Sequence, residues 1–121
     1  SDVFLEYEIW LKTIKDQVIM NEDCLMLLGQ IKALGSIKLA AEKNKISYRK
    51  AWDIIEKSET ILGFKLVEKQ RGGKDGGHTG LSGDGDNLVN AYNELKNEID
   101  LSIKKITKKF FHKINLKEKE E

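Results

Sequence analysis

Small and apolar residues between Ile37 and Ile54 recur at a spacing that few arrangements of helices can satisfy. Ala41 falls where two short helices would cross, a point at which only a small side chain fits. Ile46 lies in the break between two periodic segments, where it would fill a turn, and Ala51 and Ile54 face back onto the first segment. This pattern predicts two short helices that pack at a steep angle, which is a helix-turn-helix.

The caps and the turn of this unit indicate where each helix begins. Ser36 and Ser47 are N-cap residues placed directly before the two apolar patterns. Residues 43–45 interrupt the periodicity between them. Lys45 occupies the turn position that usually holds glycine, so either Lys45 adopts a left-handed backbone or Asn44 takes that role.

The N-terminal part of the chain predicts a hairpin followed by a helix. Residues 3–12 alternate with period two and include β-branched and aromatic side chains, which favours a strand. A turn over 13–16 and a short return strand over 17–20 would complete the hairpin. Asn21 is a good N-cap for the next helix, and Gly35 is placed to end it.

A second hairpin follows the helix-turn-helix. Residues 64–70 predict a strand, 71–80 form a glycine-rich loop, and Leu81 returns the chain to the domain. Ser82 or Asp84 would cap a long last helix. The predicted fold class is therefore mainly α with small β hairpins (α+β), a winged helix-turn-helix with an N-terminal hairpin.

The last helix carries an apolar stripe that is longer than a small domain can cover. Its members recur at intervals of three and four: Leu88, Tyr92, Leu95, Ile99, Ile103, Ile106 and Phe110. A second copy of the chain is the simplest partner for such a stripe, so we expect a homodimer. The alternative is that the stripe folds back on the first helix and hairpin of its own chain. We expect a DNA-binding domain over 1–82, a dimerisation helix over 83–114 and a charged, frayed tail over 115–121.

Nucleic-acid binding is predicted for the exposed side of the second helix of the unit. This recognition helix, about 47–59, would present its first residues to the major groove of duplex DNA, and the loop 71–80 would lie on the phosphate backbone. The predicted DNA-binding residues are Ser36, Ser47, Tyr48, Arg49, Lys50, Asp53, Arg71, Gly72, Gly73 and Lys74.

Other chemistry finds little support. The glycine-rich loop lacks the Gly-Lys-Ser/Thr ending of a phosphate loop, because Lys74 is followed by Asp75. His78 has no metal-ligand partners at suitable spacing. No nucleophile–base pair or pair of carboxylates supports catalysis, so we expect neither an enzyme nor a cofactor. Cys24 is predicted to be a buried small hydrophobe. The two tryptophans, Trp10 and Trp52, are predicted to be packing residues.

Composition leaves one rival function open. The net charge is +1, which does not by itself indicate a nucleic-acid partner. The alternative is a winged-helix protein-interaction module that has lost DNA binding. No apolar run is long enough for a membrane helix and no signal peptide is visible, so the expected location is the cytoplasm.

The chain resembles a known family over LGSIKLAAEKNKISYRKAWDIIE (34–56), LVEKQRGGKDGG (66–77) and LSGDG (81–85). These segments are similar to the N-terminal DNA-binding domain of ModE-type, molybdate-responsive regulators, which are related to LysR-type winged-helix proteins. The resemblance implies a dimeric, sequence-specific transcription regulator whose helix start is 47–50 and whose wing is 71–74. The molybdate-binding domains of that family have no counterpart before Glu121. The resemblance is therefore to a stand-alone DNA-binding form, and no small-molecule effector is expected.

Overall fold

Three helices form the centre of the molecule, which is known from a computed structural model that describes residues 3–70 and 78–117. They are α1 (Glu22–Leu34), α2 (Ile37–Lys43) and α3 (Tyr48–Leu62). The apolar sides of these helices meet in one core, in which Ile31, Ala40 and Ala51 are fully buried. The predicted helix-turn-helix is confirmed, because Ala41 is buried between α2 and α3 and Ile46 packs against the core from the turn.

Side-chain caps fix the first residue of each helix as the sequence predicts. The side chains of Asn21, Ser36 and Ser47 accept hydrogen bonds from backbone N–H groups three residues further on. Gly35 and Gly63 end α1 and α3 in left-handed conformations that glycine adopts without strain.

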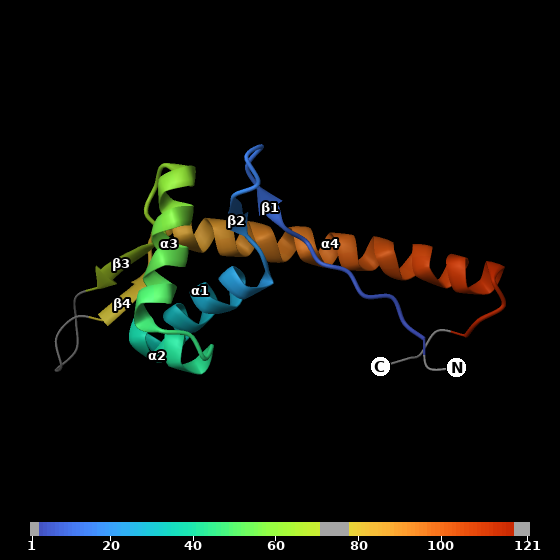
Figure 1. The fold of residues 1–121 in the computed structure, drawn as a ribbon, viewed down its shortest axis with the longest axis horizontal. Helices are drawn as coiled ribbons and strands as arrows, with labels where there is room; N and C mark the ends of the chain where they lie inside the picture. Colours follow the sequence, from blue (N-terminus) through green and yellow to red (C-terminus); the bar gives the residue numbers. More distant parts are fainter. Residues whose placement is uncertain (1–2, 71–77, 118–121) are drawn as a thin grey trace.

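The N-terminal hairpin is shorter than predicted. Strands β1 (Leu11–Lys12) and β2 (Val18–Met20) pair antiparallel, but residues 4–10 hold no strand, so the prediction of a strand over 3–12 is wrong for most of its length. The reason is that a strand needs a neighbour. This segment instead runs as an extended chain beside the outer half of the last helix (Figure 1).

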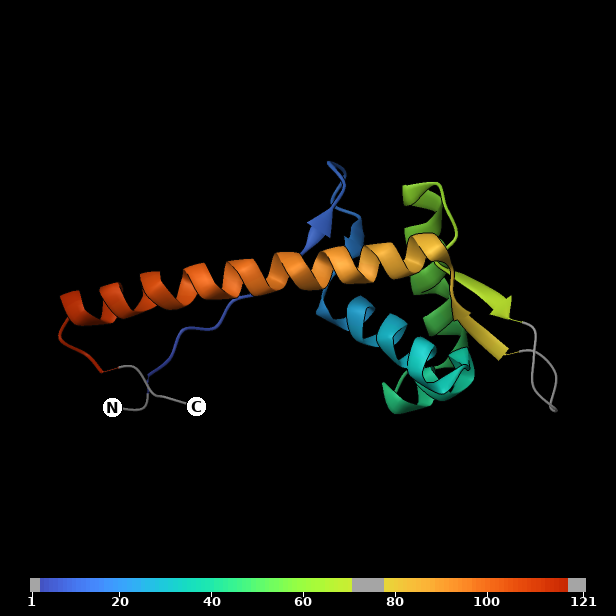
Figure 2. The same cartoon turned by 180° about the vertical axis from the view of Figure 1, so that it is seen from behind.

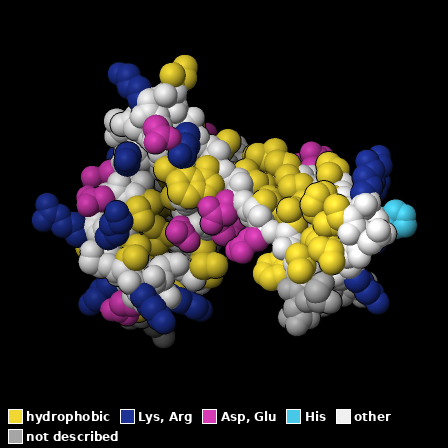
Figure 3. All heavy atoms as spheres, turned by 45° about the vertical axis from the view of Figure 1, so that its right-hand side comes forward, with side chains coloured by type: hydrophobic (Ala, Val, Ile, Leu, Met, Phe, Trp, Pro, Cys, Tyr) yellow, Lys and Arg dark blue, Asp and Glu magenta, His cyan; other side chains and the backbone are white. Residues whose placement is uncertain are grey.

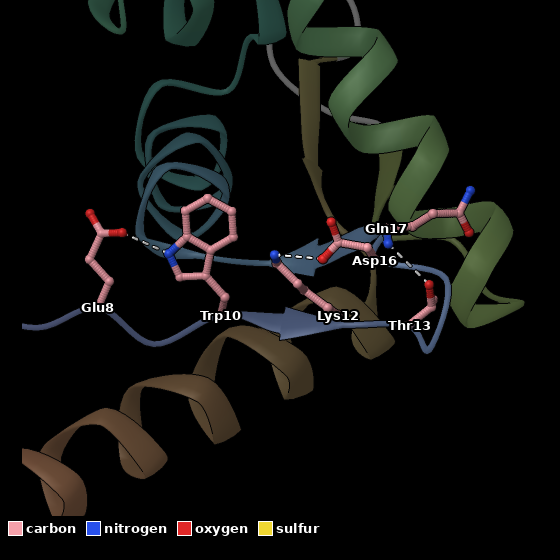
Figure 4. A network of polar contacts seen from close by, with 6 residues as sticks. All are labelled: Glu8, Trp10, Lys12, Thr13, Asp16 and Gln17. Atoms are coloured by element: carbon pink, nitrogen blue, oxygen red, sulfur yellow. Dashed lines mark hydrogen bonds and ion pairs between the residues drawn. The ribbon is translucent and has the colours of Figure 1, made fainter.

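A polar network closes the turn of this hairpin (Figure 4). Lys12 forms an ion pair with Asp16 at 2.8 Å, and the Gln17 backbone N–H donates to Thr13 Oγ1 at 3.1 Å. The prediction for Trp10 is wrong, because its side chain is 46% exposed. Its indole N–H donates to Glu8, and the Lys12 ammonium lies 4.8 Å from its ring centroid. Trp52 does pack against the core.

The second hairpin consists of β3 (Val67–Gln70) and β4 (His78–Leu81), paired antiparallel from Val67↔Leu81 to Gln70↔His78. The predicted loop over 71–80 is therefore too long at its C-terminal end, because 78–80 belong to β4. These residues extend the strand because they pair with β3 and because the Thr79 N–H donates to the Gly35 carbonyl at 3.0 Å. This hairpin is the wing of a winged helix, which confirms the predicted fold class.

The last helix, α4 (Gly83–Lys113), begins at the wing and extends far beyond the core (Figure 2). Ser82 caps it by accepting from the Gly85 N–H at 2.9 Å. Its first half packs on the core through Leu88, Val89 and Tyr92, and the Tyr92 hydroxyl donates to the Ile9 carbonyl at 2.6 Å. Part of the predicted dimerisation stripe thus contacts its own chain. Other members stay exposed, among them Leu95, Ile106 and Phe110.

Candidate nucleic-acid interface

The turn between α2 and α3 sets the angle at which α3 leaves the core. Lys45 carries the left-handed backbone with φ 58°, whereas Asn44 has φ −87°. The Asn44 side chain instead donates to the Ala40 carbonyl at 2.7 Å and to the Gln30 side chain on α1. Because these bonds join the turn to both preceding helices, the start of α3 has a fixed position.

The first turns of α3 present the predicted DNA-reading residues to solvent. Tyr48, Arg49, Lys50 and Asp53 are all exposed, while Ala51 on the opposite side is buried. None of the ion pairs among the described residues involves Arg49 or Lys50. Their donors are therefore available to an external acceptor such as a guanine edge or a phosphate.

These side chains do not gather in a single hollow. Lys50 and Asp53 lie beside a hollow of about 400 Å³ that α3 shares with β2 and the start of α1. Tyr48 lies on the other side of α3, where its ring contacts Trp52 edge-to-face with centroids 6.4 Å apart. The exposed ridge of α3 thus separates two hollows, a shape that suits insertion between the two walls of a DNA groove.

The hollow on the Tyr48 side is a groove of about 640 Å³ between α2, α3 and the wing. Ser36 lines it from the cap of α2, Lys38 from the first turn of α2, and Lys69 and His78 from the two strands of the wing. No acidic side chain lines this groove, so its charged groups attract an anion such as a backbone phosphate. Sequence reasoning missed Lys38 and Lys69, because their positions on α2 and β3 come together only in the folded chain.

A buried carboxylate attaches the wing to α3. Glu59, which is 7% exposed, accepts from the Leu66 N–H at 2.8 Å and from the Val67 N–H at 3.4 Å through Oε2. At the other strand, Ser82 donates from its hydroxyl to the Lys65 carbonyl at 2.5 Å. Sequence reasoning missed Glu59 as well. These contacts hold the base of the wing against the helix that carries the exposed side chains.

The remaining predicted positions divide into those the structure describes and those it does not. Ser36 and Ser47 cap their helices beside the groove and the exposed ridge. Arg71, Gly72, Gly73 and Lys74 lie outside the described residues.

Features of other kinds of site are few. Within 3–70 and 78–117, no three His, Cys, Asp or Glu side chains are placed to share a metal ion. Cys24 is buried as predicted, and burial raises the pKa of its thiol, which lowers the fraction of reactive thiolate. No helix of the described chain is long and apolar enough to cross a membrane.

Comparison with known proteins identifies relatives of one kind. No family model matches the chain. It is 38% identical over 88 residues to the transcriptional regulator ModE of Haemophilus influenzae, which covers 71% of this chain and 34% of the relative. It is 32% identical over 97 residues to the molybdenum-pterin-binding protein MopB of Rhodobacter capsulatus, covering 80% and 34%. It is 38% identical over 71 residues to the DNA-binding transcriptional dual regulator ModE of Escherichia coli, covering 59% and 27%.

The matched regions fix the relationship and its extent. They lie in the N-terminal part of the longer relatives, and this chain spans about a third of the length of the first of them. The expected resemblance is therefore confirmed by alignment as well as by fold. The chain belongs to the ModE-type family through the N-terminal, winged-helix region of those proteins.

Proposed function

We propose that this chain binds duplex DNA in a sequence-specific manner and regulates transcription. The observation that carries the proposal is the exposed, unpaired basic ridge of α3, with Tyr48, Arg49 and Lys50 at its start. A recognition helix reads base edges with the residues of its N-terminal turns. The printed names of the relatives, which are transcriptional regulators, support the same conclusion.

The groove beside Tyr48 supplies the second part of the proposal. Lys38, Lys69 and His78 surround an acid-free hollow at the edge of the α3 ridge. With α3 in the major groove, a DNA backbone would follow this hollow, and residues 71–74 of the wing would continue the same contact. Phosphate contacts of this kind position the protein without reading sequence.

A homodimer through α4 completes the proposal, with the DNA-binding unit over 1–82 and the dimerisation helix over 83–114. The exposed Leu95, Ile106 and Phe110 support it, because large apolar side chains clustered on one surface mark a contact site. Two copies would read a site with two-fold symmetry.

Two pairs of substitutions test the DNA contacts. A binding site is first selected from random duplexes with the parent chain, and affinities are then measured at several salt concentrations. Arg49→Ala with Lys50→Ala should remove the preference for the selected site. Lys38→Ala with Lys69→Ala should weaken selected and unrelated DNA alike, and should reduce the slope of log affinity against log salt by about one per lysine.

Lys15→Ala is the matched control, because this exposed lysine lies at the tip of the N-terminal hairpin, away from α3. It should bind DNA as the parent does. If the parent shows no salt-dependent binding to any duplex, the proposal fails, and a protein-interaction module takes its place. If the parent binds but the Arg49 and Lys50 substitutions leave site preference unchanged, the assignment of the reading helix is wrong.

A further inference from the structure

Charge is separated along α4 in a way that its own helix dipole does not explain. From Gly83 to Asp100 the helix carries five acidic side chains and one lysine, whereas from Leu101 to Lys113 it carries five lysines and no acidic side chain. The dipole favours such charges only within the first and last turns. Glu94, Glu98 and Lys105 lie well inside the helix, so their arrangement calls for another cause.

The charged residues near the middle of α4 share one exposed face. Glu94, Glu98, Leu101, Lys105 and Lys109 follow one another at intervals of three or four, which places them on the same side of the helix. All five are exposed, and no ion pair among the described residues involves the four charged ones. The buried side chains of this part of the helix, Thr107 and Phe111, recur at a different set of positions.

Exposed apolar side chains flank this face. Leu95 is 37% exposed, Leu101 and Ile106 are 65% exposed, and Phe110 is 52% exposed. Figure 3 shows hydrophobic side chains gathered where the N-terminal segment runs beside the outer half of α4, with lysines around them. The outer half of α4 therefore offers an apolar strip and a charged edge together, which is the composition of a helix–helix contact.

We infer that a second copy of the chain packs antiparallel across the outer half of α4, with the two-fold axis close to Leu101. The inference rests on the proposed homodimer and adds its direction and register. In this register Leu95 meets the partner's Ile106, while Glu98 meets the partner's Lys105. Glu94 likewise meets the partner's Lys109, and by symmetry each contact occurs twice.

The charges favour this occupant over others. A parallel pairing would bring the lysines of one copy against the lysines of the other, which is repulsive. An anionic lipid surface or a DNA backbone would attract the lysines of the outer half but would repel Glu94 and Glu98 on the same face. Only an antiparallel copy satisfies both signs of charge and covers the exposed apolar residues at once.

Charge reversal in the whole chain tests the contact, with dimer dissociation constants measured by sedimentation at low salt and at about 1 M salt. Glu94→Lys with Glu98→Lys, and separately Lys105→Glu with Lys109→Glu, should each weaken the low-salt dimer at least roughly tenfold. The chain with all four substitutions should recover the parent's affinity to within about threefold. Lys15→Glu with Lys43→Glu is the control of equal charge change away from α4, and should leave the dimer unchanged.

Single cysteines give an independent reading of direction, since the native Cys24 is buried. Ser102→Cys, beside the axis, should form a disulfide with the partner's copy of the same cysteine under mild oxidation. Ala91→Cys should not, because in an antiparallel pair its own copy lies far along the helix. In a parallel pair both would cross-link.

The outcomes separate this inference from the homodimer itself. A parent chain that stays monomeric at micromolar concentration overturns both. A dimeric parent whose affinity resists both charge reversals, or in which Ala91→Cys cross-links to itself, overturns the antiparallel contact and leaves the homodimer standing.

Discussion

The carboxylate of Glu59 is predicted to be the main link between α3 and the wing. Its Oε2 accepts two backbone N–H groups, at 2.8 Å from Leu66 and 3.4 Å from Val67, in a site where the residue is 7% exposed. A hydrogen bond to a charged group contributes about 1.5–3 kcal/mol, and a buried donor left without a partner adds a further cost. Glu59→Ala should therefore lower the free energy of unfolding by about 2–3 kcal/mol, and Glu59→Gln, which keeps an acceptor oxygen, by about 1 kcal/mol.

Urea denaturation at one fixed protein concentration measures these differences, because dimer formation would otherwise change the apparent stability. Lys65→Ala is the control: its ammonium lies 3.6 Å from Glu59 Oε1 but the lysine side chain is 81% exposed, so its loss should cost less than about 0.5 kcal/mol. If Glu59→Ala leaves stability within about 0.5 kcal/mol of the parent, the reasoning about the two N–H donors is refuted. If Lys65→Ala costs as much as Glu59→Ala, the ion pair and not the backbone contact supplies the stability.

Three further predictions concern backbone and burial. Lys45→Gly should raise the free energy of unfolding by about 0.5–1 kcal/mol in the same assay, because glycine relieves the left-handed strain at φ 58°; a loss of stability would contradict this account of the turn. Gly85→Ala should lower the melting temperature, because a Cβ there would lie 2.2 Å from the Leu66 carbonyl oxygen, whereas Gly83→Ala, with nothing within 4 Å, should leave it unchanged or raise it; equal effects would show that the two positions do not differ. The pKa of Cys24 is raised by burial from an ordinary value of 9.0, so its contribution to stability is complete below pH 9 and declines as pH rises above it. Iodoacetamide should accordingly label Cys24 slowly in the native chain and fast in urea, and rapid native labelling would show an accessible thiol.

Local chemistry explains which parts of the fold the sequence predicts well. The caps Asn21, Ser36, Ser47 and Ser82 act on N–H groups three residues ahead, so a short stretch of sequence contains both partners of each bond. The exposed start of α3 follows from helical spacing in the same way. These features need no knowledge of the rest of the chain.

Features that depend on distant partners were predicted less well. The alternation over 3–12 predicts a strand, but no second strand lies beside residues 4–10, and α4 takes the neighbouring place. The basic groove unites Lys38 with Lys69 and His78 only because the Thr79 N–H bonds the Gly35 carbonyl and brings the wing against α2. In the sequence these cations are separated by more than thirty residues, so their shared groove leaves no local pattern.

The length of α4 gives small angular changes a large effect on the reading head. A helix of 31 residues is about 46 Å long, so a tilt of about ten degrees at its outer end would swing its inner end sideways by about 8 Å. That displacement exceeds the 3.4 Å rise of a base pair, so α4 acts as a lever whose angle sets how many base pairs separate two half-sites. Evolution could thus retune operator spacing by repacking the far end of one helix while every side chain that touches a base stays the same.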